Sequence, residues 1–342
     1  MKRLSALLGM VMLVATNPAH AEETLNIYNW AGYTPPDLIE KFQKETGIKV
    51  TVDTYDSNET LLAKLMAGGG GYDIIVTAHN FIPIHVTEKL IQPIRLKEMK
   101  NAKYLGKQFI ATNWNPSDDY AVPWQWGTTS FAVDTAVYDK PVDSYETLFS
   151  PPPELQGKLG MFKSQNELTT TAQLYLGIPF CSEDPAEMGK VLELLKAQKP
   201  YVKVYGTSAS MGEQMISGEL AIESGYSGRI QRVRGEKSSV KYIYPKEGVA
   251  GWIDVIAVPA DAKNYENARK FIDFTLLPEN AAMITNFAGY ASGVPEAVKF
   301  YKPELAGAPE MTVPDGVPVI PLQTCSPAAA ELEAQVMTEL ME

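Results

Sequence analysis

The N-terminal part of the chain alternates between strand and helix patterns, and this order constrains the fold more than any other feature. Three short hydrophobic segments are typical of strands, at residues 25–29, 48–52 and 72–76. The helix expected between the first two begins after Thr34, a predicted N-cap, and ends at Gly47, and the next helix begins at about Ser57. This strand–helix–strand order predicts a parallel sheet that is covered by helices on both faces.

The remainder of the chain predicts a second α/β region. Extended segments are expected at 120–124 and 130–133, with a connection at 126–129 between them. An α/β pattern follows from about 158 to 244, and then a strand at 252–259. Three further helices are expected, at residues 265–277, 278–286 and 328–341. Because 342 residues exceed the usual size of one hydrophobic core, we expect two α/β lobes with a ligand cleft between them.

The N-terminus has the pattern of a secretory signal peptide. Lys2 and Arg3 precede an apolar run at 4–15, and Ala19-His20-Ala21 provides a small-x-small cleavage site. The apolar run is shorter than the roughly 20 residues that a membrane anchor needs. We therefore expect residues 1–21 to be removed and the mature protein to be periplasmic, without insertion into the membrane.

The composition predicts a globular, acidic protein. The hydrophobic fraction is 45% and the aromatic fraction is 10%, both within the range of folded proteins. The formal charge of −11 disfavours nucleic acid and anionic membranes as partners and slightly favours cationic solutes. No later segment is long and apolar enough to predict a membrane span.

The sequence lacks the motifs of common enzymes and metal sites. Beyond the signal peptide only His79 and His85 remain as histidines, and their spacing does not place them together on a helix. The glycine run 68–71 leads into a strand and lacks the Lys-Ser/Thr of a phosphate-binding loop. We therefore expect a protein that is not an enzyme and that has no cofactor or metal.

Two cysteines, Cys181 and Cys325, are present. In an oxidising compartment an even pair predicts one disulfide, and the alternative is two buried thiols. Either state is structural rather than catalytic.

Several aromatic residues lie where expected strands end and loops begin: Trp30, Tyr33, Trp124, Trp126, Tyr226, Trp252 and Tyr290. In a cleft such rings can cover a methylene chain and attract an ammonium group by cation–π contact. Asp254 follows Trp252 by two residues and would share its strand face, where it could hold an ammonium by a charge-assisted hydrogen bond. Core packing of the rings and a solvated Asp254 remain the alternatives.

Five short strings together resemble the spermidine/putrescine-binding periplasmic proteins. They are Asn29-Trp30-Ala31-Gly32-Tyr33, the segments 56–59, 64–68 and 244–248, and Trp252-Ile253-Asp254-Val255 with the following 258–263. The resemblance extends from about residue 25 to 300. It implies a type II periplasmic binding-protein fold with two hinge crossings, and an inner-membrane ABC permease with its ATPase as partner.

On this resemblance, lobe 1 is expected at 22–130 and lobe 2 at 131–255. Residues 256–305 return to lobe 1, and 306–342 form a C-terminal segment that packs on lobe 2. The family's binding positions correspond to Trp30, Tyr33, Glu167, Tyr226, Trp252, Asp254 and Tyr290.

Several positions depart from the polyamine-binding pattern. Ala31 and Gly32 stand where family members have a hydroxyl residue and an acid, and Ala78 stands where a serine is common. Arg229 stands where the family has an acid that takes the far amine of the ligand. An arginine would repel a second ammonium, but its planar fork suits a carboxylate.

These departures predict a ligand with an ammonium at one end and a carboxylate at the other, as in the γ-aminobutyrate-binding branch of the family. Asp254 would take the ammonium, Arg229 the carboxylate, and Trp126 would close over the ligand from the hinge. If Glu167 instead pairs with Arg229 and cancels its charge, the ligand is putrescine or spermidine. A sensory protein that presents its ligand to a receptor would use the same site, and nothing in the pattern demands more than a monomer.

Overall fold

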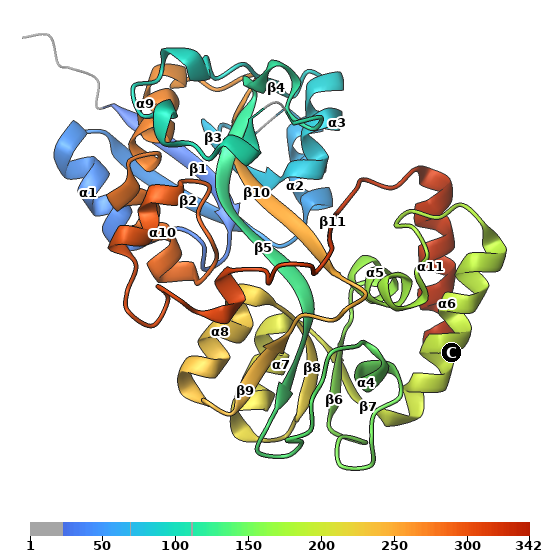
Figure 1. The fold of residues 1–342 in the computed structure, drawn as a ribbon. Coiled ribbons are helices and arrows are strands. Elements are labelled where there is room, and N and C mark those ends of the chain that lie inside the picture. Colours follow the sequence, from blue (N-terminus) through green and yellow to red (C-terminus); the bar gives the residue numbers. More distant parts are fainter. Residues whose placement is uncertain (1–22, 69, 111) are drawn as a thin grey trace, which may run out of the picture.

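The computed structural model describes residues 23–68, 70–110 and 112–342, so the predicted signal peptide lies outside the described residues. The chain begins with strands and helices in alternation (Figure 1). They are β1 (Thr24–Trp30), α1 (Pro36–Thr46), β2 (Lys49–Tyr55), α2 (Asn58–Met66), β3 (Ile74–Ala78), α3 (Ile82–Thr87) and β4 (Ile91–Gln92). β1 pairs in parallel with both β2 and β3, as the sequence order predicted.

A second alternation occupies the middle of the chain. It comprises α4 (Glu146–Phe149), β6 (Leu159–Phe162), α5 (Gln165–Leu176), α6 (Pro185–Gln198), β7 (Val202–Gly206), α7 (Ser208–Ser217), β8 (Ile222–Tyr226), α8 (Ser227–Glu236) and β9 (Val240–Ile243). The chain ends with α9 (Tyr265–Thr275), α10 (Pro278–Ala288), β11 (Val319–Pro321) and α11 (Pro327–Met341). β6 pairs in parallel with β7 and β8, so both halves contain parallel strands.

Two long antiparallel strands, β5 (Ala121–Asp134) and β10 (Val249–Pro259), join the halves (Figure 1). The strand order is β2-β1-β3-β10-β5-β8-β6-β7, so β10 borders the N-terminal strands and β5 borders β8. The connection predicted at 126–129 is wrong. Those residues pair with β10 and continue β5 without a break.

The hydrophobic residues form a separate core on each side of this crossing. One core packs β1 and β3 with α1, α9 and α10, and includes Phe42 and Phe271. The other packs β6 with α5, α6 and α11, and includes Tyr145 and Leu340. Two cores on one continuous sheet confirm the predicted α/β class. The lobe boundaries at 130/131 and 255/256 remain predictions.

The residues predicted to cap the helices lie at the observed helix ends in two of three cases. Gly47 ends α1 with φ 76°, the left-handed region that favours glycine. Ser57 caps α2 and accepts a hydrogen bond from the Thr60 backbone N–H. The prediction that Thr34 caps α1 is wrong. Its Oγ1 accepts from the Asn29 side chain instead, and Pro35 occupies the cap position.

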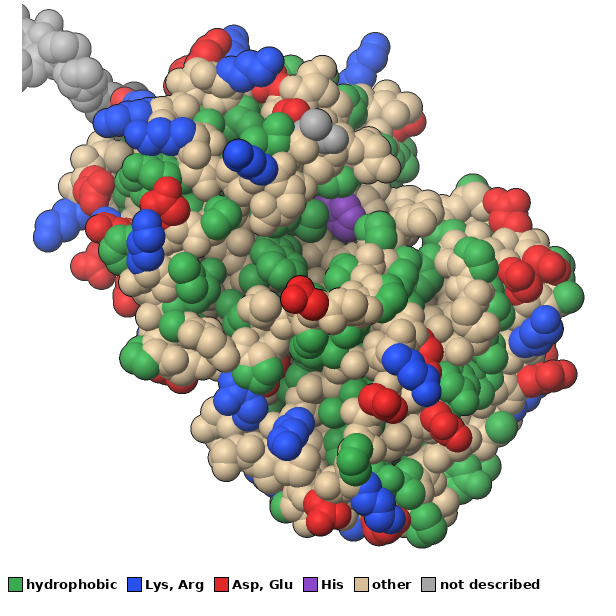
Figure 2. Space-filling view, viewed as in Figure 1, with side chains coloured by type: hydrophobic (Ala, Val, Ile, Leu, Met, Phe, Trp, Pro, Cys, Tyr) green, Lys and Arg blue, Asp and Glu red, His purple; other side chains and the backbone are tan. Residues whose placement is uncertain are grey.

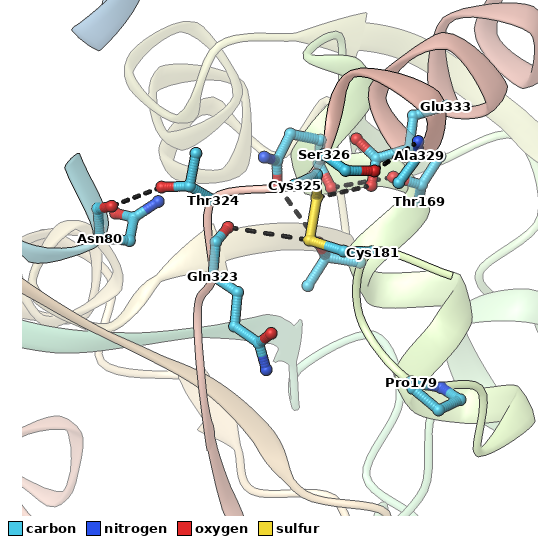
Figure 3. Close-up of a disulfide and its surroundings, with 12 residues drawn as sticks. Asn80, Thr169, Pro179, Cys181, Gln323, Thr324, Cys325, Ser326, Ala329 and Glu333 are labelled. Atoms are coloured by element: carbon cyan, nitrogen blue, oxygen red, sulfur yellow. Dashed lines mark hydrogen bonds between the residues drawn. A yellow bond between two sulfur atoms is a disulfide. The ribbon is translucent and has the colours of Figure 1, made fainter. Parts of the chain in front are cut away.

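A C-terminal strap, residues 319–326, runs along the hinge and is tied to α5–α6 by a disulfide between Cys181 and Cys325 (Figure 3). The predicted disulfide is therefore confirmed. The Thr324 hydroxyl donates a hydrogen bond to the backbone carbonyl of Asn80, which follows β3. The strap thus contacts both halves of the molecule. Within the described part of the chain no helix combines the length and the apolar character needed to cross a bilayer.

Candidate functional site

Aromatic rings from both halves meet beside the hinge strands. The Trp252 ring lies 5.1 Å from the Tyr290 ring and 6.0 Å from the Tyr226 ring, measured between centroids. Tyr33 lies 5.6 Å from Tyr290. Trp252 pairs with Gly127 on β5, and a Cβ at that glycine would lie 2.6 Å from Cζ2 of Trp252. The Trp252 ring therefore occupies space that a side chain at position 127 would fill.

Asp254 lies at one end of this aromatic cluster. It is 7% exposed, and burial raises the pKa of its carboxyl to about 7, although the Tyr33 hydroxyl and the Trp30 indole N–H, which face it, partly lower that pKa. Trp30 ends β1 and Tyr33 lies in the turn that follows, so the carboxyl end of β1 supplies both groups. A cation bound here would hold Asp254 in its ionised form.

Glu167 lies at the other end of the cluster. It occupies the first turn of α5, and its Oε1 accepts a hydrogen bond of 2.9 Å from the Tyr226 hydroxyl. Burial raises the pKa of Glu167 to about 7, and the Tyr226 hydrogen bond only partly offsets this effect. Both Asp254 and Glu167 act on the pKa of Tyr290, which burial raises to about 12. Both carboxyls therefore lie near the Tyr290 ring, as do the guanidinium groups of Arg232 and Arg229, which lower its pKa.

Two polar atoms in this cluster are buried and have no hydrogen-bond partner among the described residues: Nε1 of Trp252 and Oε2 of Glu167. Buried polar groups are normally paired, because an unpaired one costs about 1–3 kcal/mol. Such groups at the border of two lobes are suited to contact a ligand that enters between them.

Arg229 makes contacts that the sequence did not predict. It is on α8, and its Nη2 donates to Oε1 of Glu213 at 2.7 Å and to the backbone carbonyl of Ala209 at 3.0 Å, both on α7. A Cβ at Gly212 of α7 would lie 2.5 Å from Nε of Arg229, so the guanidinium packs directly on that helix. Among the described residues no hydrogen bond or ion pair joins Arg229 to Asp254 or Glu167, and Nε of Arg229 is buried without a partner. The clamp of Arg229 and Asp254 across a ligand stays a prediction.

Trp126 also differs from its expected placement. It pairs with Ile253, whereas the neighbouring pair is Gly127 with Trp252, so strand alternation turns Trp126 to the opposite face of the hinge. Its indole N–H donates to the backbone carbonyl of Ser292 at 3.1 Å. Trp126 therefore makes no ring contact with the aromatic cluster, although it lines the same cavity as Trp252.

A cavity of about 380 Å³ lies beside the hinge and is lined by Trp126, Trp252 and His79, together with Val319 and Pro321 of the strap. Figure 2 shows a hollow between the two halves with a histidine side chain in it. His79 was not among the predicted site residues. It follows the carboxyl end of β3, and the rule that binding residues gather at such ends could have found it. Burial lowers the pKa of His79 to about 4, so its ring is neutral at pH 7.

Among the described residues no group of three or more His, Cys, Asp or Glu side chains is arranged to hold a metal ion. The chemistry of the cluster is that of two acids, aromatic faces and the unpaired indole N–H of Trp252. This combination is suited to binding an organic cation.

Comparison with known proteins agrees with this geometry. Residues 37–313 match the family described as bacterial extracellular solute-binding protein. The chain is 35% identical to the putrescine-binding periplasmic protein SpuD of Pseudomonas aeruginosa, over 79% of this chain and 78% of that protein. It is 34% identical to the spermidine/putrescine-binding periplasmic protein of Escherichia coli, over 86% of this chain and 85% of that protein.

A solved structure has the same fold. The spermidine/putrescine substrate-binding protein PotD of Streptococcus pneumoniae superposes with a TM-score of 0.82 at 25% identity, over 93% of this chain and 98% of that one. The type II periplasmic binding-protein fold expected from the sequence is thereby confirmed. This chain belongs to the bacterial extracellular solute-binding proteins, within the family of spermidine/putrescine-binding periplasmic proteins.

Proposed function

We propose that this protein captures a linear diamine or polyamine, putrescine or spermidine, in the periplasm and delivers it to an ABC importer. The observation that carries the proposal is the pair of buried carboxyls, Asp254 and Glu167, at the two ends of one aromatic cluster. A ligand with an ammonium at each end and methylene groups between them matches this arrangement of charge and apolar surface.

We propose putrescine or spermidine as the ligand, in place of the γ-aminobutyrate that the sequence favoured. That expectation depended on Arg229 as the partner of a ligand carboxylate, but the guanidinium binds Glu213 and the Ala209 carbonyl. A ligand carboxylate would meet Glu167 instead, and two like charges in a buried site repel each other. The names of the related proteins also favour polyamines.

Each site residue has a proposed role. Asp254 binds one ammonium and Glu167 the other, while the Trp252 and Tyr290 rings enclose the methylene chain between them. Trp30, Tyr33 and Tyr226 complete the enclosure and orient the two carboxyls. Trp126 and Arg229 have no direct role.

Capture would proceed by closure of the two halves about β5 and β10, which join them. The closed form would then dock on a membrane permease that works with an ATPase. The related proteins named above favour this use over a sensory role, which would need the same site.

The proposal is tested by isothermal titration calorimetry of the mature, ligand-stripped protein with putrescine, spermidine and γ-aminobutyrate. We expect both amines to bind more tightly than γ-aminobutyrate. Asp254→Asn and Glu167→Gln should each weaken putrescine binding at least about 30-fold, because truncating a buried charge pair costs 2 kcal/mol or more.

Arg229→Ala separates the two ligand classes. It should change putrescine affinity less than about threefold, because Arg229 faces α7. Tight binding of γ-aminobutyrate that is lost in Arg229→Ala would overturn the proposal and restore the carboxylate clamp.

A further inference from the structure

Gln125 on β5 is a buried polar residue beside the cluster, and its amide has no partner in the described part of the chain. Its side chain is fully buried, and neither Oε1 nor Nε2 has a hydrogen-bond partner among the described residues. A glutamine amide has donors and an acceptor that normally are all paired when buried. A residue held in this state is a candidate for contact with something that enters the site.

The strand register places Gln125 beside Asp254. The two residues are directly paired across β5 and β10, so their side chains share one face of the sheet with Cβ atoms about 4.5–5.5 Å apart. Trp252 and Gly127 form the next row on the same face. Gln125 therefore lies on the same face of the β5–β10 pair as the Trp252 ring and the Asp254 carboxyl.

An irregularity in the strand adds to this placement. Asp254 pairs with Gln125 but Val255 pairs with Pro123, which leaves Trp124 as the extra residue of a β-bulge. Bulges re-aim neighbouring side chains and occur frequently next to binding sites. Trp124 packs in the hydrophobic core, on the side of the strand away from Gln125.

We infer that Gln125 is a second amine-recognition residue, which makes the Asp254 end of the site specific for a primary ammonium. This inference rests on the proposed function. A primary ammonium has three N–H donors, and a carboxylate on one side of it cannot accept hydrogen bonds from all three. In the ligand-bound state, Gln125 Oε1 accepts one of the remaining hydrogens, and Nε2 turns to donate to the Asp254 carboxylate and keeps it ionised.

The test is Gln125→Met, which keeps the length of the side chain and removes its hydrogen bonds. Putrescine affinity should fall at least about tenfold, the value of one hydrogen bond to a charged group. The ligand-free variant should have an unchanged or higher Tm, because an unpaired buried amide has been removed. If Gln125 had only a structural role, its substitution would lower the stability of the ligand-free protein, so a loss of affinity at unchanged Tm indicates contact with the ligand.

Gln198→Met is the matched control. Gln198 is equally buried, but it lies at the end of α6 and its Nε2 donates to the Leu148 carbonyl at 2.8 Å. This control should lower the Tm and leave putrescine affinity unchanged. If Gln125→Met binds putrescine within twofold of the unmodified protein, or if its ligand-free Tm falls as well, the inference is wrong. If the unmodified protein binds no amine, the proposed function itself is wrong.

Discussion

At the residue scale, the site is defined by acids that burial makes weak. Asp254 and Glu167 have no arginine or lysine partner among the hydrogen bonds and ion pairs of the described residues, and burial raises the pKa of each to about 7. By contrast, Asp134 is paired with Lys237 at 2.8 Å, and contacts with Lys237 and Ser239 lower its pKa. A carboxyl that is buried without a cationic partner is available to a cationic ligand.

These raised pKa values predict that amine affinity falls in acid. At pH 8 both carboxyls are ionised in the ligand-free protein, whereas below pH 7 they take up protons that a bound ammonium must displace. We expect putrescine affinity to fall by up to about tenfold per pH unit for each carboxyl below pH 7. Calorimetry between pH 8 and pH 5.5 would measure this fall, and an affinity that is independent of pH would contradict it.

The ligand-free protein should show the opposite trend. Because the folded-state pKa of each acid lies above the unfolded value, the folded state binds more protons than the unfolded state between about pH 4 and pH 7. These two groups therefore add stability as the pH falls through 7. Glu167→Gln should reduce both the pH dependence of binding and the number of protons released when putrescine binds.

At the element scale, the hinge strands build the site as well as join the lobes. β10 carries Trp252 and Asp254, while β5 carries Gly127 and Gln125 opposite them. The ladder fixes which side chains share a face, so one pair of strands sets both the position of the aromatic ring and the position of the acid.

Gly127→Ala tests this dependence. The new Cβ would lie 2.6 Å from Trp252 Cζ2 and 3.0 Å from Ser227 Oγ, so the ring must move. Overpacking of this kind costs about 1–3 kcal/mol, and we expect putrescine affinity to fall at least about fivefold. Gly189→Ala in α6 is the control, because its Cβ meets nothing within 4 Å. It should keep full affinity and gain about 0.5–1 kcal/mol of stability. Unchanged affinity in Gly127→Ala would show that the ring position is not needed.

At the scale of the whole molecule, the negative charge should speed the capture of a cation. The formal net charge of the full chain is −11, and long-range attraction raises association rates but is screened by salt. We expect the association rate constant for putrescine to fall several-fold between 10 mM and 500 mM NaCl, while the dissociation rate changes little. Stopped-flow tryptophan fluorescence would measure both rates, because Trp30 and Trp252 belong to the proposed site. An association rate that does not depend on salt would contradict this expectation.

The sequence by itself determined the α/β class, the order of most elements, and the residue types of the site. Strands and helices are indicated by the local spacing of hydrophobic residues, which can be read directly from the sequence. Two cysteines in a chain expected to be secreted can form only one disulfide, with each other. The strings around Trp30 and Trp252 indicated the family, which the comparisons then confirmed.

Only the tertiary structure decided which of those residues face each other. Arg229 could be assigned to the ligand from its position in the chain, but the packing of α8 on α7 gives it Glu213 as a partner. Trp126 and Gln125 are neighbours in sequence, and strand alternation turns them to opposite faces of the hinge; the pairing with β10 decides which face carries Asp254. The charge that a ligand meets is set by contacts between residues far apart in the chain, and local sequence does not encode those contacts.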